Sequence, residues 1–155
     1  MKGFIADTML GTLAKWLRVL GFDTLYEAGM VDDKILQLAN EQQRIILSRD
    51  RALCTRKQDS IFIETTDLDQ QIVQVIQSYP ANMDLLLSRC LECNSLLEVI
   101  AREDVSPEAL PDGLWERYEE YWLCERCNAY YWRGSHFDKM RLKAGQLLEK
   151  SIEKI

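Results

Sequence analysis

Two C-x-x-C pairs constrain this chain more than any other feature of its sequence. Cys90 and Cys93 form one pair, Cys124 and Cys127 form the other, and residues 94–123 separate them. Each pair makes a tight turn that directs two thiolates at one ion, and two such turns complete a closed tetrahedral Zn²⁺ site. The four cysteines therefore predict a zinc ribbon with a structural metal, and iron is the alternative. We interpret the fifth cysteine, Cys54, as a small apolar filler.

Residues 1–88 alternate between short apolar runs and amphipathic segments. The apolar runs predict strands at 3–7, 23–28, 44–48 and 60–64. Spacings of three and four between apolar residues predict helices at 9–21, 33–43 and 66–80, with Asp32 as the N-cap of the second. This alternation is typical of an α/β domain in which helices cover both faces of a parallel sheet. A last helix is predicted at 137–150, capped by Ser135, and we expect two domains, 1–88 and 89–155.

Composition and charge restrict where the protein acts and what it binds. Apolar residues make up 47% of the chain and charged residues 28%, which is typical of a globular protein. There is no apolar run of the roughly 20 residues that a spanning helix needs, and residues 1–7 do not resemble a signal peptide, so we expect a cytoplasmic protein that does not bind membranes. The net charge of −6 argues against strong nonspecific binding to nucleic acids.

The predicted ribbon is the most acidic part of the chain. Residues 89–134 hold five Lys or Arg against ten Asp or Glu, a net charge of −5. Bound zinc with four thiolates would add a further negative charge. We therefore interpret the ribbon as a lid, a brace or a contact for a partner protein rather than as a phosphate-binding surface.

Four acidic residues are predicted to meet at one edge of the sheet. Asp7 and Asp50 end the first and third strands, and Asp32 and Asp33 begin a helix on the same rim. Because converging carboxylates repel each other, a cation such as Mg²⁺ or Mn²⁺ is expected between them. Such a site can activate water for attack on a phosphodiester. Each acid also has a purely structural interpretation: Asp7 as an acid that closes a turn at the sheet edge, Asp32 as an N-cap, Asp33 in favourable contact with the helix dipole, and Asp50 as a cap paired with Arg51.

Basic residues near these acids are candidate phosphate contacts. Arg49 and Arg51 flank Asp50, and Lys15 and Arg18 lie off the apolar stripe of the first helix. Other chemistries are excluded by residue type. The chain has no phosphate-binding G-x-x-x-x-G-K-[ST] loop, and its single histidine, His136, lies far from the predicted sheet edge.

A family resemblance is carried by the acidic pair at 32–33 and by three segments, DTMLGTLAKWLRVLGFDTLY, ILSRDR and YWLCERCNAYYWRGSHFDKM. Together they resemble the mut-7 C-terminal RNase domain family, a branch of the PIN-like nucleases. The resemblance runs from residue 3 to about 142. It implies a three-layer α/β/α PIN-like domain with a fused zinc ribbon. It also implies cleavage of RNA at an acidic site dependent on Mg²⁺ or Mn²⁺. The family's acids correspond here to Asp7, to Asp32 or Asp33, and to Asp50, and its T-R-D motif reads Ser48-Arg49-Asp50.

Our leading hypothesis is a metal-dependent ribonuclease. Asp7 and Asp50 would bind the metal, and Asp32 or Asp33 would be a further ligand or position the water. Two alternatives stay open: a non-catalytic adaptor that binds RNA or protein through an inert PIN-like fold, and a toxin-like nuclease held by a partner protein.

Overall fold

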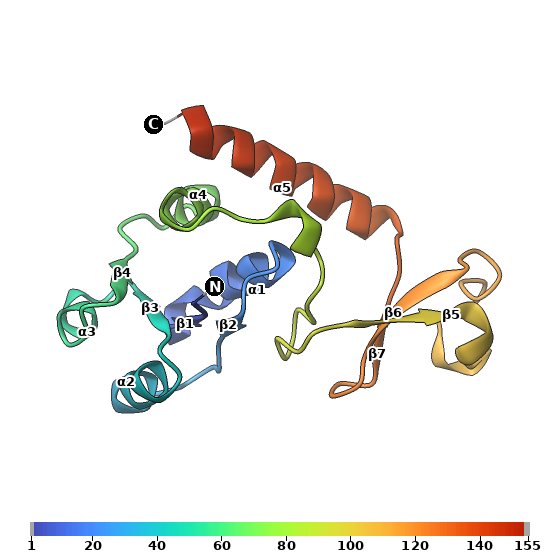
Figure 1. Ribbon diagram of the computed structural model, residues 1–155, viewed down its shortest axis with the longest axis horizontal. Coiled ribbons are helices and arrows are strands. Elements are labelled where there is room, and N and C mark those ends of the chain that lie inside the picture. Colours follow the sequence, from blue (N-terminus) through green and yellow to red (C-terminus); the bar gives the residue numbers. More distant parts are fainter. Residues whose placement is uncertain (1, 154–155) are drawn as a thin grey trace.

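The computed structural model describes residues 2–153, in which a parallel α/β domain is joined to a small antiparallel sheet and a long C-terminal helix (Figure 1). The first sheet has four parallel strands in the order β2-β1-β3-β4. Its strands are β1 (Phe4–Ala6), β2 (Thr24–Leu25), β3 (Ile45–Ser48) and β4 (Ser60–Phe62). The helices that connect and follow them are α1 (Gly11–Val19), α2 (Asp32–Glu41), α3 (Arg51–Thr55) and α4 (Leu68–Ser78).

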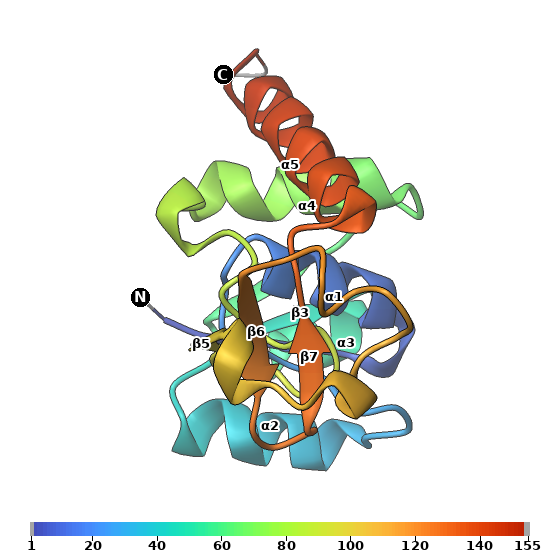
Figure 2. The same cartoon turned by 90° about the vertical axis from the view of Figure 1, so that its right-hand side faces the viewer.

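Helices cover both faces of this sheet, which confirms the predicted α/β class. Successive residues of a strand point to opposite faces, so Phe4 and Ala6 enter one core while Ile5 enters another. The first core includes buried residues of α1 and α4, and the second includes Ile35 of α2 and Leu53 of α3. Figures 1 and 2 show α2 and α4 on opposite sides of the strands. The domain therefore has three layers.

The first two helices differ in detail from the sequence prediction. A short 3₁₀ turn at Thr8–Leu10 precedes α1, and the predicted apolar stripe from Leu10 to Leu20 is buried. Asp32 is the first residue of α2 rather than its cap, because Val31 occupies the cap position. The carboxylate of Asp32 therefore stabilises α2 through its place in the first turn, where the helix dipole favours negative charge.

The cysteine pairs lie beside a three-stranded antiparallel sheet, β5-β6-β7, as expected for a ribbon: the first pair precedes β5, and the second lies at the turn between β6 and β7. Its strands are β5 (Glu98–Ala101), β6 (Glu120–Cys124) and β7 (Ala129–Tyr131). A separate small core supports it, in which Val105, Leu110 and the fully buried Tyr121 are surrounded by partly buried aromatic rings. The Tyr121 hydroxyl donates to the Leu114 carbonyl at 2.8 Å, so its polar atom is satisfied inside this core.

The C-terminal helix α5 (Ser135–Glu153) returns to the parallel domain and packs on α4. Ala144 and Leu147 are buried in the same core as α1 and α4, and Lys143 forms an ion pair with Asp69 at 2.7 Å. The helix starts two residues before the predicted 137, so Ser135 lies within its first turn instead of capping it. The division into 1–88 and 89–155 remains a prediction, and it assigns α5 to the second unit although this helix packs on the first.

Candidate functional site

Asp7 and Asp50 lie at the carboxyl edge of the parallel sheet, and a serine links their segments. Asp7 directly follows β1, and its backbone N–H donates to the Leu47 carbonyl of β3 at 2.9 Å. Ser48 ends β3, and its hydroxyl donates to Asp7 Oδ2 at 2.6 Å while accepting from the Asp50 backbone N–H at 2.9 Å. This hydroxyl is buried and serves both segments. The parallel pairing of β1 with β3 thus brings together two residues that are 43 positions apart in the sequence.

The Asp7 side chain is buried without a cationic partner among the described residues. It is 6% exposed, and its two carboxylate oxygens accept hydrogen bonds from the hydroxyls of Ser48 and Thr8, at 2.6 and 3.1 Å. Burial of a carboxylate is costly unless opposite charge compensates for it. Two neutral hydroxyls satisfy the hydrogen-bonding capacity only in part and leave the charge uncompensated. The Asp7 carboxylate is therefore suited to binding a cation.

Asp50 is exposed and caps α3. Its Oδ1 accepts a hydrogen bond of 2.7 Å from the Ala52 backbone N–H, the usual N-cap contact. The pairing with Arg51 expected in the structural interpretation is not observed among the described contacts. The Arg51 guanidinium lies 4.1 Å from the centroid of the Phe62 ring and 4.0 Å from Glu64. Asp50 thus keeps a second carboxylate oxygen that no described contact occupies.

Asp32 and Asp33 lie at the start of α2, and both are exposed. Asp33 accepts from Arg56, which follows α3, at 2.7 Å, so this ion pair joins α2 to the segment after Asp50. Among the described residues, the four zinc-type cysteines are the one group of three or more His, Cys, Asp or Glu side chains whose ligand atoms could share an ion. The four predicted acids therefore lie on one rim without converging on one point.

Cys54, which the sequence analysis interprets as a small apolar filler, lies next to the acidic edge. Its thiol is half-buried and lies 3.9 Å from the Ser48 carbonyl oxygen. Burial raises the pKa of this thiol, and the negative charges of Asp50 and Asp7 raise it further. Cys54 is therefore a neutral thiol at neutral pH. The i+4 spacing from Asp50 in a helical turn was the signal that could have placed it here.

The candidate phosphate contacts have very different surroundings. Lys15 is exposed and pairs with Glu92 of the first cysteine turn at 2.7 Å. Arg49 is partly buried, and its Nε atom has no hydrogen-bond partner in the described structure. Arg18 is 2% exposed, and the Nε and Nη1 atoms of its guanidinium donate to backbone carbonyls. It donates to Thr24 O at 2.9 Å, to Leu91 O at 2.7 Å and to Glu92 O at 2.9 Å. Arg18 thus holds the first cysteine turn against α1 and β2, a position closed to phosphate.

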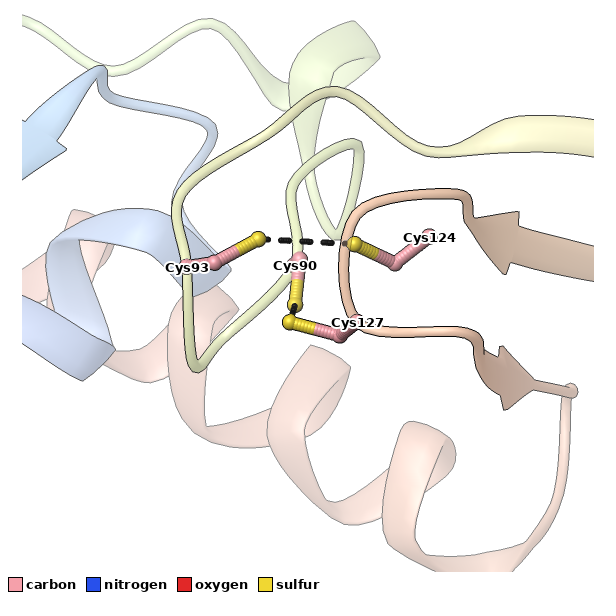
Figure 3. A group of neighbouring side chains, drawn as sticks. All are labelled: Cys90, Cys93, Cys124 and Cys127. Carbon is pink, nitrogen blue, oxygen red and sulfur yellow. Dashed lines mark hydrogen bonds between the residues drawn. The ribbon is translucent and has the colours of Figure 1, made fainter.

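The four cysteines form a metal centre whose geometry fits one tetrahedral ion. Their Sγ atoms all lie within 4.8 Å of one another, and Figure 3 shows two sulfurs from each turn pointing toward a common centre. The separations are 3.4 Å for Cys93–Cys124 and 3.9 Å for Cys90–Cys127. Zn–S bonds of about 2.3 Å in a tetrahedron place sulfurs about 3.8 Å apart. The cluster is therefore consistent with structural zinc, as the cysteine spacing predicts.

The protonation of these thiols also indicates a metal. Contact with Cys93 raises the pKa of Cys127 to about 12, with smaller contributions from burial and from Cys90. Burial opposes ionisation of Cys93, but hydrogen bonds with the hydroxyl and amide of Ser95 lower its pKa to about 6. Four sulfurs at these separations cannot all ionise unless a cation compensates for their charge. One Zn²⁺ would supply that compensation and stabilise all four as thiolates.

Comparisons with known proteins identify the family of this chain. Within the part of the chain that the structure describes, no helix has the length and apolar character required to cross a membrane. No curated protein and no solved structure matched the sequence. A family model described as the Mut7-C RNAse domain matches residues 2–144, which include the acidic edge, the cysteine centre and the first half of α5. The chain belongs to the Mut7-C RNase domain family.

Proposed function

We propose that this protein is an Mg²⁺- or Mn²⁺-dependent ribonuclease that hydrolyses RNA phosphodiester bonds at the edge occupied by Asp7 and Asp50. Membership of the family implies ribonuclease activity and an RNA substrate. The observation that carries the metal-dependent mechanism is the buried Asp7 carboxylate, which has no compensating cation among its described contacts. Oxygen ligands of this kind suit Mg²⁺ and Mn²⁺ better than softer metals.

Each residue of the edge has a defined role in this proposal. Asp7 and the free oxygen of Asp50 hold the ion, and the Ser48 hydroxyl fixes both segments relative to each other. Asp32 or Asp33 is a further ligand or positions the attacking water. A bound divalent ion supplies an activated water and stabilises the negative charge that develops on the phosphate.

Four basic residues are the proposed phosphate contacts. Arg49, Arg51 and Arg56 follow or flank Asp50 in the sequence, and Lys15 lies on α1. The Arg51 side chain is exposed and packs on Phe62, so it is held in place while its guanidinium faces solvent. A cytoplasmic location completes the proposal, because thiols stay reduced there and can hold zinc.

The test combines cleavage with metal-dependent stability. We expect Asp7→Asn and Asp50→Asn to lose cleavage of a single-stranded RNA, whereas Asp59→Asn, which changes an exposed acid paired with Lys2, retains it. Without divalent metal, Asp7→Asn should melt at or above the wild-type temperature, because it removes an uncompensated buried charge. Millimolar Mn²⁺ should raise the melting temperature of the wild type but not of Asp7→Asn. Equal cleavage by all variants would contradict the proposal.

A non-catalytic adaptor is the second candidate, favoured by one observation. The four acids do not form a compact group with ligand atoms in reach of one ion, in contrast to the cysteines. An adaptor would bind RNA or protein with no response to Mn²⁺ and no cleavage. The melting experiment therefore separates the two candidates even when no suitable substrate is at hand.

A further inference from the structure

A groove of about 640 Å³ lies between the ribbon, the segment that leads into it and the start of α5. Its volume is in the range of roughly 300–1,000 Å³ that small-molecule sites occupy. Six of its lining residues are aromatic: Tyr118, Trp122, Tyr130, Tyr131, Trp132 and Phe137. In Figure 1 the ribbon and α3 lie at opposite ends of the molecule, so the groove is separate from the acidic edge.

The charge of the groove is opposite to that of the ribbon around it. Its described lining contains Arg89, Arg117 and His136 and no Asp or Glu, although residues 89–134 hold ten acids. Arg89 donates to Gly21 O at 3.3 Å and to Asn94 O at 2.8 Å, so its charge is fixed in the wall. Arg117 and His136 are exposed, and the described contacts include no side-chain hydrogen bond or ion pair for either. The lining therefore offers one fixed and one available positive charge to an anion.

The aromatic rings of the groove differ in how much of their surface is already covered. Arg133 lies 5.1 Å from the centroid of the Trp122 ring, and the Tyr131 hydroxyl lies 3.2 Å from Cys90 Sγ. Trp132 is partly buried against the small ribbon core, and its ring has no cation or hydrogen-bond partner among the described contacts. A Cβ at Gly134 would lie 2.8 Å from Trp132 Nε1, so the glycine provides the space that this indole occupies. Trp132 thus lines the groove without a polar partner to displace, and it can stack with a planar ligand.

We propose that this groove binds unpaired RNA, with a base stacked on Trp132 and the adjoining phosphate at Arg117 and His136. Stacking on aromatic rings combined with cations for the backbone is how proteins hold single strands. An acid-free lining within the most acidic segment of the chain favours an anionic ligand over an apolar peptide. The inference rests on the proposed RNA substrate but not on cleavage, and it adds a strand-anchoring site remote from the acidic edge.

The test measures RNA binding without cleavage. Anisotropy of a labelled oligouridine is followed in buffer free of Mg²⁺ and Mn²⁺, with wild-type protein, Trp132→Ala, Arg117→Glu and Arg126→Glu. Arg126 lies in the second cysteine turn, is exposed and does not line the groove, so its variant is the matched control. We expect Trp132→Ala to weaken binding about 10-fold or more, since a stacked base contributes on the order of 10-fold to 100-fold. Arg117→Glu should also weaken it, and Arg126→Glu should bind closer to wild type than Arg117→Glu does.

Zinc content and melting temperature of each variant are first compared with those of the wild type, to detect variants that do not fold. If Trp132→Ala does not fold, the RNA affinity of Arg117→Glu decides the test. Arg117→Ala should reduce the slope of log affinity against log salt by about one. A duplex of the same length should bind more weakly than the single strand. Equal affinity of the groove variants and Arg126→Glu would overturn the proposal, as would a change in oligomeric state in place of a change in RNA affinity.

The experiments distinguish failure of the groove proposal from failure of the ribonuclease proposal. If Trp132→Ala loses RNA binding and Asp7→Asn retains it, RNA binding in the groove is supported whether or not the protein cleaves RNA. If cleavage requires Asp7 but both groove variants bind RNA with unchanged affinity, ribonuclease activity is supported and RNA binding in the groove is contradicted.

Discussion

At the scale of single residues, Arg18 shows how far a helical pattern can be misleading. Its position off the apolar stripe of α1 predicts exposure, yet it is 2% exposed because the first cysteine turn covers it. Burial lowers the pKa of the guanidinium, and the neighbouring cysteines, Glu92 and Asp23 oppose that shift. The residue therefore remains a cation and joins the ribbon to the parallel domain.

We expect Arg18→Ala to lower the free energy of unfolding by about 3 kcal/mol, because it leaves three backbone carbonyls without their donor. Lys15→Ala is the matched control on the same helix. Its exposed ion pair with Glu92 should contribute less than about 1 kcal/mol. Denaturant unfolding of the two variants checks the difference, and equal losses would contradict the role assigned to Arg18.

Cys54 reports on the charge of the acidic edge. Burial first, and then the carboxylates of Asp50 and Asp7, raise its pKa, so the thiolate forms only at elevated pH. Asp50→Asn removes one repelling charge, which lowers this pKa and should speed alkylation of Cys54 by iodoacetamide at a fixed, mildly alkaline pH. Zinc protects the other four cysteines, so mass spectrometry follows Cys54 alone. An unchanged rate in Asp50→Asn, relative to Asp59→Asn, would show that the two groups do not interact.

At the scale of elements, the close approach of α1 to the segment leading to the ribbon depends on Gly21. This residue follows α1 with φ of 85°, and a Cβ there would lie 2.4 Å from the Leu85 carbonyl oxygen. The Leu87 backbone N–H donates to Val19 O at 2.7 Å in the same region. The end of α1 and the residues around Leu85 therefore fit together only when position 21 has no side chain.

Gly21→Ala should destabilise the protein by at least about 2 kcal/mol, since the strained φ and the backbone contact add together. Gly29→Ala isolates the first effect. Gly29 has φ of 79° and no atom within 4 Å of its would-be Cβ, so only about 1 kcal/mol is expected from backbone strain. Thermal unfolding of both variants measures the difference. Similar losses would mean that Leu85 moves aside at little cost.

At the scale of the whole molecule, a metal-dependent ribbon is held between two parts of one α/β domain. Arg18 and Lys15 contact its first turn, and α5 leaves β7 and packs back on α4. Asn94 adds a further link, because its side chain accepts from the Thr24 backbone N–H at 2.9 Å and donates to Asp23 at 2.6 Å. The cysteine cluster therefore lies close to the contacts that join the ribbon to the parallel domain.

Removal of zinc should unfold the ribbon and lower the melting temperature of the remaining protein. Without the ion, the small core around Tyr121 is too limited to hold three short strands together. The parallel domain keeps its own two cores, so most helical signal in far-UV circular dichroism should persist. Cys124→Ser should reproduce the effect of chelation, whereas Cys54→Ser should retain zinc. A zinc-free protein that melts like the wild type would contradict this expectation.

Much of the fold was predictable from particular residues. The two C-x-x-C pairs determine a shared tetrahedral centre, and the alternation of apolar runs with helical stripes determines a parallel sheet between helices. Asp7 and Asp50 were placed on one edge because parallel strands end together. The helix caps were predicted less accurately than the helices. Asp50 does cap α3, but Val31 and not Asp32 is the cap of α2. The exact end of a helix depends on a single turn of backbone, which the apolar pattern does not define.

The sequence by itself determined the four cysteines of the metal-binding cluster, the three-layer class and the edge on which the acids lie, because each follows from spacing along the chain. Only the tertiary structure decided that Arg18 is buried, that Ser48 joins the Asp7 and Asp50 segments, and that an acid-free aromatic groove exists within an acidic ribbon. The physical reason is that the periodicity of apolar residues indicates only which faces of their own helix or strand are apolar. Which face a distant segment covers, and where its charges point, depends on packing between residues that the sequence holds far apart.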